Sequence, residues 1–293
     1  MGQIYAILLR IAAAGLLVAM SALVYEALKE ATIGQAVFWR SLWSLPVILI
    51  YARCFGPLRG VLKTDHPFHH VRRGLLGLMA MGLHFICLAH LPISYATALG
   101  FLTPILALPL AFAMLGERIT RVLIVASFLG FGGVLLISFA QLENGGLPPA
   151  SIIGIGAGLG FAAVMALIRV YVKRLTAKDS PSLIALSFST ITTLGGLATL
   201  PFGWASLSNT AFFYLICAGV LGGLGHALSN ESVKRSDVAV LGPFDYTSII
   251  WALGIDIVIF GFEPNRFGMF GMTLIVLAGL SVAISQVKRR QIV

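Results

Sequence analysis

Long apolar runs alternate with short polar breaks along the whole chain. The runs from Val122 to Ala140 and from Met269 to Ser285 contain no charged residue. The hydrocarbon core of a bilayer is about 30 Å thick, and about 20 apolar residues cross it as one α-helix. A membrane β-barrel would instead show alternating strands of about ten residues, so these continuous runs predict membrane-spanning helices.

The runs predict ten helices, which end at polar, glycine and proline breaks. The predicted spans are residues 4–25, 33–52, 73–91, 94–116, 122–140, 151–172, 182–201, 209–230, 237–261 and 267–287. The composition agrees, because 58% of the residues are hydrophobic, 11% are charged and the mean hydropathy is +0.96, whereas a soluble domain needs a polar surface. The predicted fold class is an all-α membrane protein with ten transmembrane helices.

The basic residues come in short bursts that occupy alternate breaks, a pattern typical of cytoplasmic loops. One set of breaks carries most of them, including Arg53, Lys63 and Lys178, while the other set holds Lys29 and Arg266. This pattern accounts for the formal net charge of +9 without a nucleic-acid partner. It also predicts that the N-terminus and the C-terminus are both cytoplasmic.

The break before residue 73 is rich in histidine and arginine. It contains His66, His69 and His70 beside Arg72 and Arg73. Because this break lies between two predicted spans on the cytoplasmic side, we expect these side chains in a solvated loop, where they add surface charge.

The two halves of the chain share small and polar residues in the same order. Gly77 and His84 recur as Gly219 and His226, each 142 positions later. Since each half has five predicted spans, an odd number, the second half would enter the membrane from the opposite side. Inverted repeats around a central cavity are typical of secondary transporters, whose site lies near the bilayer midplane. The expected repeats are residues 1–143 and 147–293.

One long segment carries a family pattern. It has an apolar helix from Val71, a Leu-Pro break at 91–92, an alanine-rich helix with Pro104 and a closing Gly-Glu-Arg at 116–118. This order resembles the third and fourth helices of the drug/metabolite transporter superfamily, EamA type. The segment from Phe38 to Trp43 resembles the arginine-bearing second helix of that superfamily.

The resemblance is strongest to bacterial amino-acid exporters, including those for aromatic amino acids. It implies a secondary transporter of the bacterial inner membrane that exports aromatic or bulky neutral amino acids by alternating access. Asp245 and Tyr246 stand where the second half of the family often carries Glu-Pro, so no coupling mechanism is carried over.

Two other functions stay open. A nucleotide-sugar carrier or another metabolite carrier of the same superfamily is one. For phosphate it would need cations inside the membrane, where only Arg40 lies well within a predicted span and Arg10 and Arg169 lie near the cytoplasmic face. An intramembrane enzyme is the other, but it would need a nucleophile with a base, or a full metal-ligand set. The chain shows no such motif, so we expect no enzyme.

Two histidines at equivalent positions of the halves are the first candidates for substrate binding. His84 and His226 lie near the middle of their predicted helices, and the repeat would place them on opposite walls of the cavity. Ionisable side chains inside a membrane are usually functional, although a single histidine can also bond a neighbouring helix. No metal and no cofactor are expected, because two imidazoles without carboxylate or thiolate partners are fewer than the usual ligands.

Polar candidates follow on the second-half helices. Asn230 lies one helical turn after His226 and so shares its face. Asp245 lies about two turns inside its predicted helix, where its carboxyl group could bind a proton or a neighbouring helix. Asn230 could contact the substrate or form a hydrogen bond between helices.

The apolar candidates for substrate binding are aromatic residues and methionines near the predicted midplane. They are Met81, Phe101, Phe161, Met165 and Tyr246. Each could equally pack against lipid or another helix. Pro104 and Pro243 are the expected hinges of alternating access. The expected partners are a small-molecule substrate and the lipid bilayer, and a monomer is the expected assembly.

Overall fold

The computed structural model describes residues 2–54, 67–103, 105–106, 110, 121–143, 149–175, 181–235 and 241–290. Throughout this part of the chain there is no β-strand, and ten α-helices follow one another with two short 3-10 helices. The α-helices are α1 (Gly2–Ala27), α2 (Ile33–Cys54), α4 (Pro67–His90), α5 (Ile93–Gly100), α7 (Arg121–Glu143), α8 (Pro149–Leu175), α9 (Pro181–Leu197), α10 (Asn209–Arg235), α12 (Thr247–Val258) and α13 (Arg266–Arg290). The 3-10 helices are η1 (Leu200–Phe202) and η2 (Gly242–Tyr246). The prediction of an all-helical chain with ten helices is confirmed for these residues.

Six of the described helices are long and apolar enough to cross a membrane. They are α1, α2, α4, α8, α9 and α10. Shorter apolar stretches lie in α7 and α13. Large apolar side chains cover the outside of the bundle, among them Phe128 at 75% exposed and Val258 at 82%. Lipid can cover such a surface while the helices satisfy their own backbone hydrogen bonds, so the chain is a multi-pass membrane protein.

Proline and asparagine mark where several helices begin. Pro67, Pro149 and Pro181 are the first residues of α4, α8 and α9, a position where the missing N–H of proline costs no hydrogen bond. Before α13, the side-chain oxygen of Asn265 accepts a hydrogen bond of 2.9 Å from the Gly268 N–H. That bond satisfies one of the free donors of the first turn.

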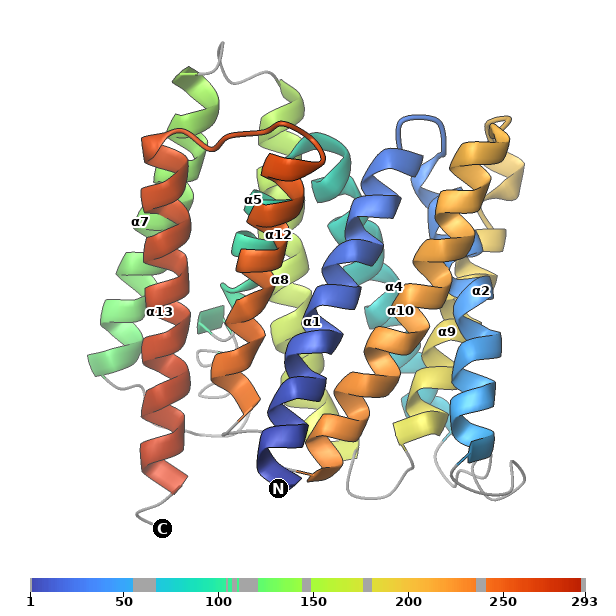
Figure 1. Ribbon diagram of the computed structural model, residues 1–293, viewed down its shortest axis with the longest axis horizontal. Helices are drawn as coiled ribbons and strands as arrows, with labels where there is room; N and C mark the ends of the chain where they lie inside the picture. Colours follow the sequence, from blue (N-terminus) through green and yellow to red (C-terminus); the bar gives the residue numbers. More distant parts are fainter. Residues whose placement is uncertain are drawn as a thin grey trace.

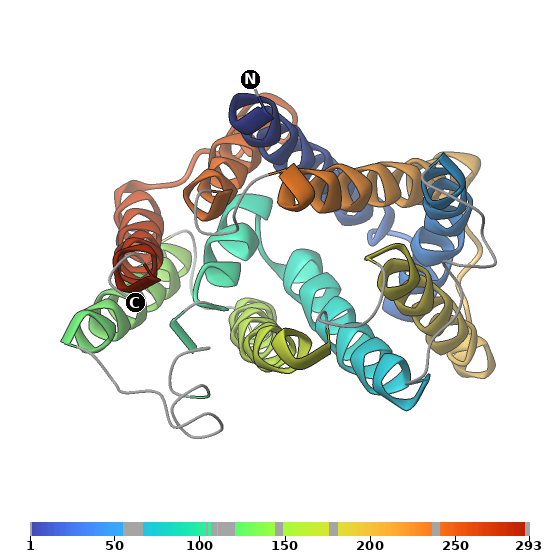
Figure 2. The ribbon, with the colours of Figure 1, turned by 90° about the horizontal axis from the view of Figure 1, so that it is seen from below.

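The helices stand side by side, and the start of α1 and the end of α13 lie at the same end of the bundle, which we call the N-terminal end (Figure 1). Seen from below, α1 and α10 form one side of the cross-section and α4 and α8 form the opposite side (Figure 2). The pair α2 and α9 closes one end, and the pair α7 and α13 closes the other. Between them, α5 packs against α12.

The helices α7 and α13 cross with their backbones in contact. A Cβ atom added to Gly133 would lie 2.6 Å from the carbonyl oxygen of Gly271, and one added to Gly271 would lie 2.7 Å from the carbonyl oxygen of Gly133. Small residues of this kind let helices in membranes approach closely. A side chain at either position would force the two helices apart.

The start of α4 corrects one prediction. The helix begins at Pro67, before the predicted span at residue 73, so residues 69–73 lie on a helix and not in a loop. His70 is 4% exposed, and its Nδ1 atom lies 3.2 Å from Ser187 Oγ on α9. One face of the first turns of α4 therefore packs against α9, while Phe68 and Arg72 on these turns are exposed. His66 lies outside the described residues.

The predicted span at residues 237–261 is divided in the structure. Gly242–Tyr246 form η2, and the α-helical part runs from Thr247 to Val258. Proline lacks the N–H that a helix interior needs, and Pro243 lies in the first turn of η2. Pro104, the other expected hinge, lies outside the described residues.

Candidate functional site

His84 on α4 lies against the ring of Phe161 on α8. The ring centroids are 4.8 Å apart, with an angle of 38° between the planes. The Nδ1 atom of His84 is buried and has no hydrogen-bond partner among the residues that the structure describes. Two candidates that the sequence placed on different helices are therefore in direct contact.

Aromatic rings continue from this pair to η2. Phe161 touches the end of α5, because a Cβ atom added to Gly100 would lie 3.3 Å from its Cε1. The next residue, Phe101, stacks on Tyr246 of η2, with centroids 4.5 Å apart and 28° between the planes. We call His84, Phe161, Phe101 and Tyr246 the aromatic row. It joins α4, α8, the end of α5 and η2.

The position of α5 is fixed by a carboxylate from α12. Asp256 is 2% exposed, and its oxygens accept hydrogen bonds from the backbone N–H groups of Ile93 at 3.2 Å and Ser94 at 2.7 Å. These are free donors at the start of a helix, which a negative charge stabilises. Asp256 therefore helps to place α5 and the Phe101 ring that follows it.

Arg40 on α2 is enclosed by the bundle and is 3% exposed. Its Nη2 atom lies 3.3 Å from His226 Nε2 on α10, and its Nε and Nη2 atoms lie 3.3 Å from Met20 Sδ on α1. Because a guanidinium group can only donate, Nε2 of His226 is the acceptor. The Nη1 atom of Arg40 is buried without a partner in the described part of the chain.

A second guanidinium group reaches the same region from α4. The Cζ atom of Arg73 lies 5.1 Å from the centroid of the Phe188 ring on α9, a cation–π contact. The Phe188 ring in turn stands edge-on to His226, with centroids 6.4 Å apart and 78° between the planes. We call Arg40, Arg73, Phe188 and His226 the arginine cluster. Arg40 therefore contacts His226 directly, whereas Arg73 is connected to it through the Phe188 ring.

Buried polar atoms without partners gather on α2 and α4. Among the described residues, seven buried side-chain nitrogen or oxygen atoms have no hydrogen-bond partner. Five of them are nitrogens of Arg40, Trp43, Arg73 and His84. Folded proteins pair nearly all buried polar groups, so this concentration makes the interior beside α2 and α4 the candidate site.

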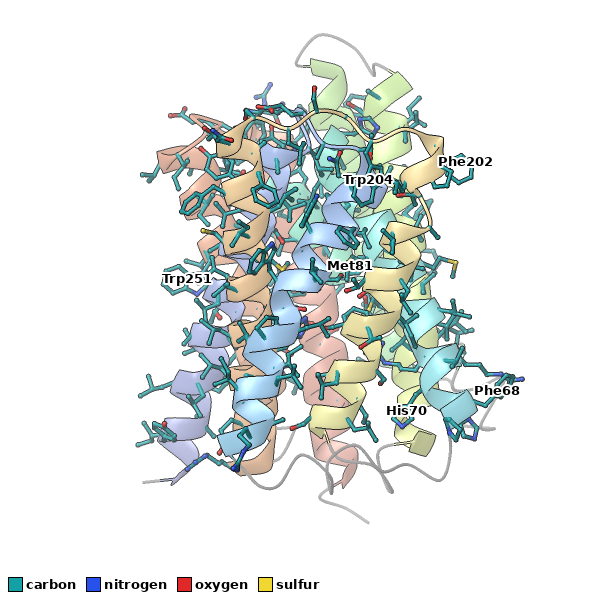
Figure 3. The ribbon with its side chains drawn as sticks, turned by 90° about the vertical axis from the view of Figure 1, so that its right-hand side faces the viewer. Phe68, His70, Met81, Phe202, Trp204 and Trp251 are labelled. Carbon is teal, nitrogen blue, oxygen red and sulfur yellow. The ribbon has the colours of Figure 1, made fainter. Side chains whose placement is uncertain are left out.

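Met81 lies between the helices that carry His84 and Arg40. It is 8% exposed and lies one turn before His84 on α4, and Ser41 Oγ of α2 lies 3.8 Å from its Sδ atom. Figure 3 shows Met81 well away from Phe202 at one end of the bundle and Phe68 at the other. Met81 therefore lies in the interior, one turn from His84 on α4 and in contact with the sequence neighbour of Arg40 on α2.

For the remaining candidate residues, the structure describes fewer side-chain contacts. Met165 packs beside Phe161 in a small apolar cluster between α4 and α8, which is the packing alternative considered for it. The side chains of Asn230 and Pro243 lie outside the described residues, as does Pro104. In the part of the chain that the structure describes, no three His, Cys, Asp or Glu side chains gather as metal ligands.

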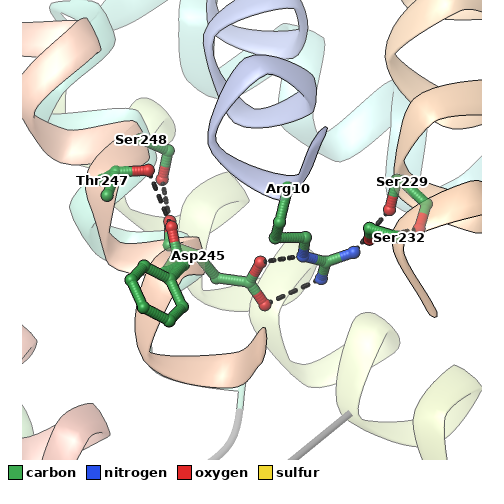
Figure 4. A network of polar contacts seen from close by, with 7 residues as sticks. Arg10, Ser229, Ser232, Asp245, Thr247 and Ser248 are labelled. Carbon is green, nitrogen blue, oxygen red and sulfur yellow. Dashed lines mark hydrogen bonds and ion pairs between the residues drawn. The ribbon is translucent and has the colours of Figure 1, made fainter. Parts of the chain in front are cut away.

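Asp245 in η2 is bound by Arg10 of α1 (Figure 4). The carboxylate accepts hydrogen bonds from Nε and Nη2 of Arg10, the second at 2.8 Å. Nη1 of Arg10 donates to the Ser229 hydroxyl on α10. The bidentate ion pair therefore joins α1 to η2, and the Ser229 hydrogen bond joins α1 to α10. For Asp245 this is the bond to a neighbouring helix that the sequence allowed beside proton or substrate binding.

The sequence did not show that Arg73 is an interior residue. Counting basic residues cannot separate a loop from the first turns of a helix, and Arg73 was assigned to a cytoplasmic break on that basis. One signal was available, because Pro67 is favoured as the first residue of a helix. A helix from Pro67 places Arg73 almost two turns inside it. The contact between Arg10 and Asp245 had no local signal, since they are 235 positions apart.

A model of the EamA-like transporter family matches residues 1–139 and again residues 152–284. The chain belongs to the EamA-like transporter family. It is therefore a membrane transporter of small molecules and not an enzyme.

Relatives of this EamA-like transporter carry names of different cargoes. An S-adenosylmethionine uptake transporter of Rickettsia prowazekii is 26% identical over 257 residues, which cover 87% of this chain and 84% of that protein. A riboflavin transporter of Rhizobium johnstonii is 24% identical over 267 residues, 88% of this chain and 83% of the relative. A solved crystal structure matches 97% of this chain and 98% of its own, with a TM-score of 0.68 and 19% identity. That structure has the same fold.

Proposed function

We propose that this EamA-like transporter moves amino acids with an aromatic or bulky neutral side group across a bacterial inner membrane by alternating access. The observation that carries the proposal is the aromatic row, which brings rings from four elements together beside a buried nitrogen of His84 that has no partner in the described part of the chain. Flat groups stack favourably on such rings. The nitrogen can hold a polar group of the same solute.

Two relatives are named for solutes that contain a flat aromatic group. S-adenosylmethionine, named for the Rickettsia protein, is an amino acid that carries an aromatic base. Riboflavin, named for the Rhizobium protein, is a flat heterocycle. Both could stack on aromatic rings. The family resemblance implies export, whereas the Rickettsia name describes uptake, so the direction of flux has to be measured separately.

We also propose that residues 1–143 and 147–293 are inverted repeats, with both termini in the cytoplasm. The family model matches once in each half, and the helix contacts support the same interpretation. In the repeat, α1 of the first half corresponds to α8 of the second, and α4 corresponds to α10. The contact between α1 and α10 therefore has a counterpart between α8 and α4, and both contacts are present. The pairs α2–α9 and α7–α13 would each join a helix to its own counterpart. A two-fold relation between the halves produces this set of contacts.

Cysteine labelling tests the topology. Single cysteines at Asn144 and Asn209 should react with an impermeant maleimide from the periplasm, and those at Lys63 and Lys178 only after the membrane is permeabilised. The reason is that an odd number of spans per half places these pairs on opposite sides. Labelling of both pairs from the same side would contradict the inverted arrangement.

Counterflow in proteoliposomes tests the cargo. Labelled phenylalanine, tryptophan and S-adenosylmethionine should exchange at rates well above empty liposomes, with leucine slower, because only flat groups can stack along the aromatic row. The same panel should include riboflavin and a nucleotide sugar, and each solute should be measured with and without a pH gradient. Robust exchange of the nucleotide sugar without any amino-acid flux would overturn the proposal.

A further inference from the structure

We infer that the arginine cluster binds the carboxylate of the transported solute. The inference rests on the proposed function and adds the group by which the solute is held. It assigns the carboxylate to Arg40 and Arg73, while the side group of the solute lies along the aromatic row.

The first support is the state of the two guanidinium groups. Arg40 is 3% exposed and its Nη1 atom is unpaired, and both Nε and Nη1 of Arg73 are buried without a partner among the described residues. Removing a cation from water is costly unless an opposite charge and hydrogen bonds compensate. Guanidinium groups bind carboxylates through two parallel N–H···O bonds, which these free nitrogens can donate.

The second support is that the described acidic side chains are engaged elsewhere or exposed. Asp245 is held by Arg10, and Asp256 accepts two backbone N–H groups at the start of α5. The others contact polar groups near the ends of helices or are exposed, namely Glu26, Glu30, Glu231 and Glu263. Within the described residues, the arginine cluster has no counter-ion of its own. A solute anion would supply one.

The third support is the position of the cluster relative to the aromatic row. Ser41, the neighbour of Arg40 on α2, contacts Met81, and Met81 lies one turn from His84 on α4. Arg73 and His84 are 11 positions apart on α4, about three full turns, so they share one face of that helix. The two Cα atoms are about 16 Å apart along the axis, but the Arg73 side chain runs along α4 toward His84, since its Nη1 atom would lie 2.8 Å from a Cβ atom added to Gly77. We place a solute with a carboxylate at one end and a flat group at the other in the interval between this guanidinium group and the row. An aromatic amine without a carboxylate can contact only the row.

Thermal unfolding of the purified full-length protein in detergent provides the test. The midpoint should rise with 3-phenylpropionate, which has the ring and the carboxylate, because a ligand that binds only the folded state stabilises it. Phenethylamine, which has the ring and an amine, should raise it little at the same concentration and ionic strength. Inorganic phosphate serves as a third probe, because a phosphorylated cargo would also use two arginines.

Arginine variants test whether the stabilisation by 3-phenylpropionate depends on the arginine cluster. Arg40→Gln and Arg73→Gln should each weaken binding of 3-phenylpropionate about ten-fold or more, and Arg40→Lys should keep part of it because the charge remains. Arg72→Gln is the control, since Arg72 is the neighbour of Arg73 but is exposed and lies over the Phe68 ring at 4.4 Å. Its binding should equal that of the wild type. If Arg40→Gln does not fold, Arg73→Gln and Arg40→Lys decide the question.

The outcomes separate this inference from the proposed function. Equal stabilisation of the wild type and of Arg73→Gln by 3-phenylpropionate would overturn the carboxylate site, and so would stabilisation by phosphate alone. Transport of aromatic amines as fast as aromatic amino acids would also overturn it while leaving an aromatic-solute transporter in place. Stabilisation by 3-phenylpropionate with no amino-acid flux in liposomes would instead leave the carboxylate site and remove the proposed cargo.

Discussion

Replacing His84 by alanine is expected to reduce counterflow of an aromatic amino acid at least about ten-fold, the effect of losing roughly 1.4 kcal/mol of binding. The change removes both the ring that contacts Phe161 at 4.8 Å and the buried Nδ1 atom that has no partner among the described residues. The protein should stay folded with a lowered unfolding midpoint, because no described hydrogen bond of Nδ1 is lost, while the ring contact and the space that the ring leaves both reduce stability. Initial rates in liposomes and thermal unfolding in detergent measure the two effects.

His90→Ala is the matched control for this variant. His90 is the last residue of α4 and is exposed, so its removal should change neither flux nor stability. His226→Ala should reduce flux less than His84→Ala, because its Nε2 already accepts from Arg40 at 3.3 Å. Normal transport by His84→Ala, or loss of flux only through misfolding, would show that His84 is a packing residue.

Breaking the ion pair between Arg10 and Asp245 should have the second large effect, on stability as well as flux. Asp245→Asn keeps the size of the side chain but leaves Arg10 with a neutral partner. Removing one partner of a buried ion pair costs about 3–5 kcal/mol, and we expect about 1–3 kcal/mol here because the Asp245 side chain is 34% exposed. Thermal unfolding should show a lower midpoint, and the flux should fall because α1 is less firmly held to η2.

An exchange of charges tests whether the pair itself matters. Arg10→Asp combined with Asp245→Arg should recover part of the stability that each single change loses. Glu26→Gln is the control, since it breaks an exposed ion pair with Lys29, whose side chain is 61% exposed, and such pairs contribute little. If the effects of the single changes simply add in the double variant, the ion pair does not couple α1 to η2.

Much of the fold could be predicted because lipid leaves few choices. The hydrophobic runs had to be helices, and the ten predicted spans correspond to the ten described α-helices. The predicted start of α4 was wrong because the basic residues in its first turns are also typical of a cytoplasmic loop. The sequence also did not predict that the span containing Pro243 divides into a 3-10 helix and an α-helix, because hydropathy does not distinguish the two.

The candidate site could be predicted only in part. Depth in the helix and repetition between halves selected His84 and His226, and the structure places each beside a ring or a cation. Neither property reveals which helix a side chain faces. The partner of Asp245 and the burial of Arg73 depend on contacts between distant segments, so they required the three-dimensional arrangement.

The distance along the chain between Arg10 and Asp245 also affects how the protein is made. The two residues are 235 positions apart, and at about 5–20 residues per second α1 stays in the membrane on the order of ten seconds or longer before η2 is synthesised. Residues 4–27 are the most hydrophobic of the candidate spans, with a hydropathy of 2.3, and can remain in lipid alone. Arg10 lies about two turns from the start of α1 and can meanwhile reach the headgroups. Closure of this ion pair is therefore a late event of biogenesis, and it can occur only after nearly the whole chain has left the ribosome.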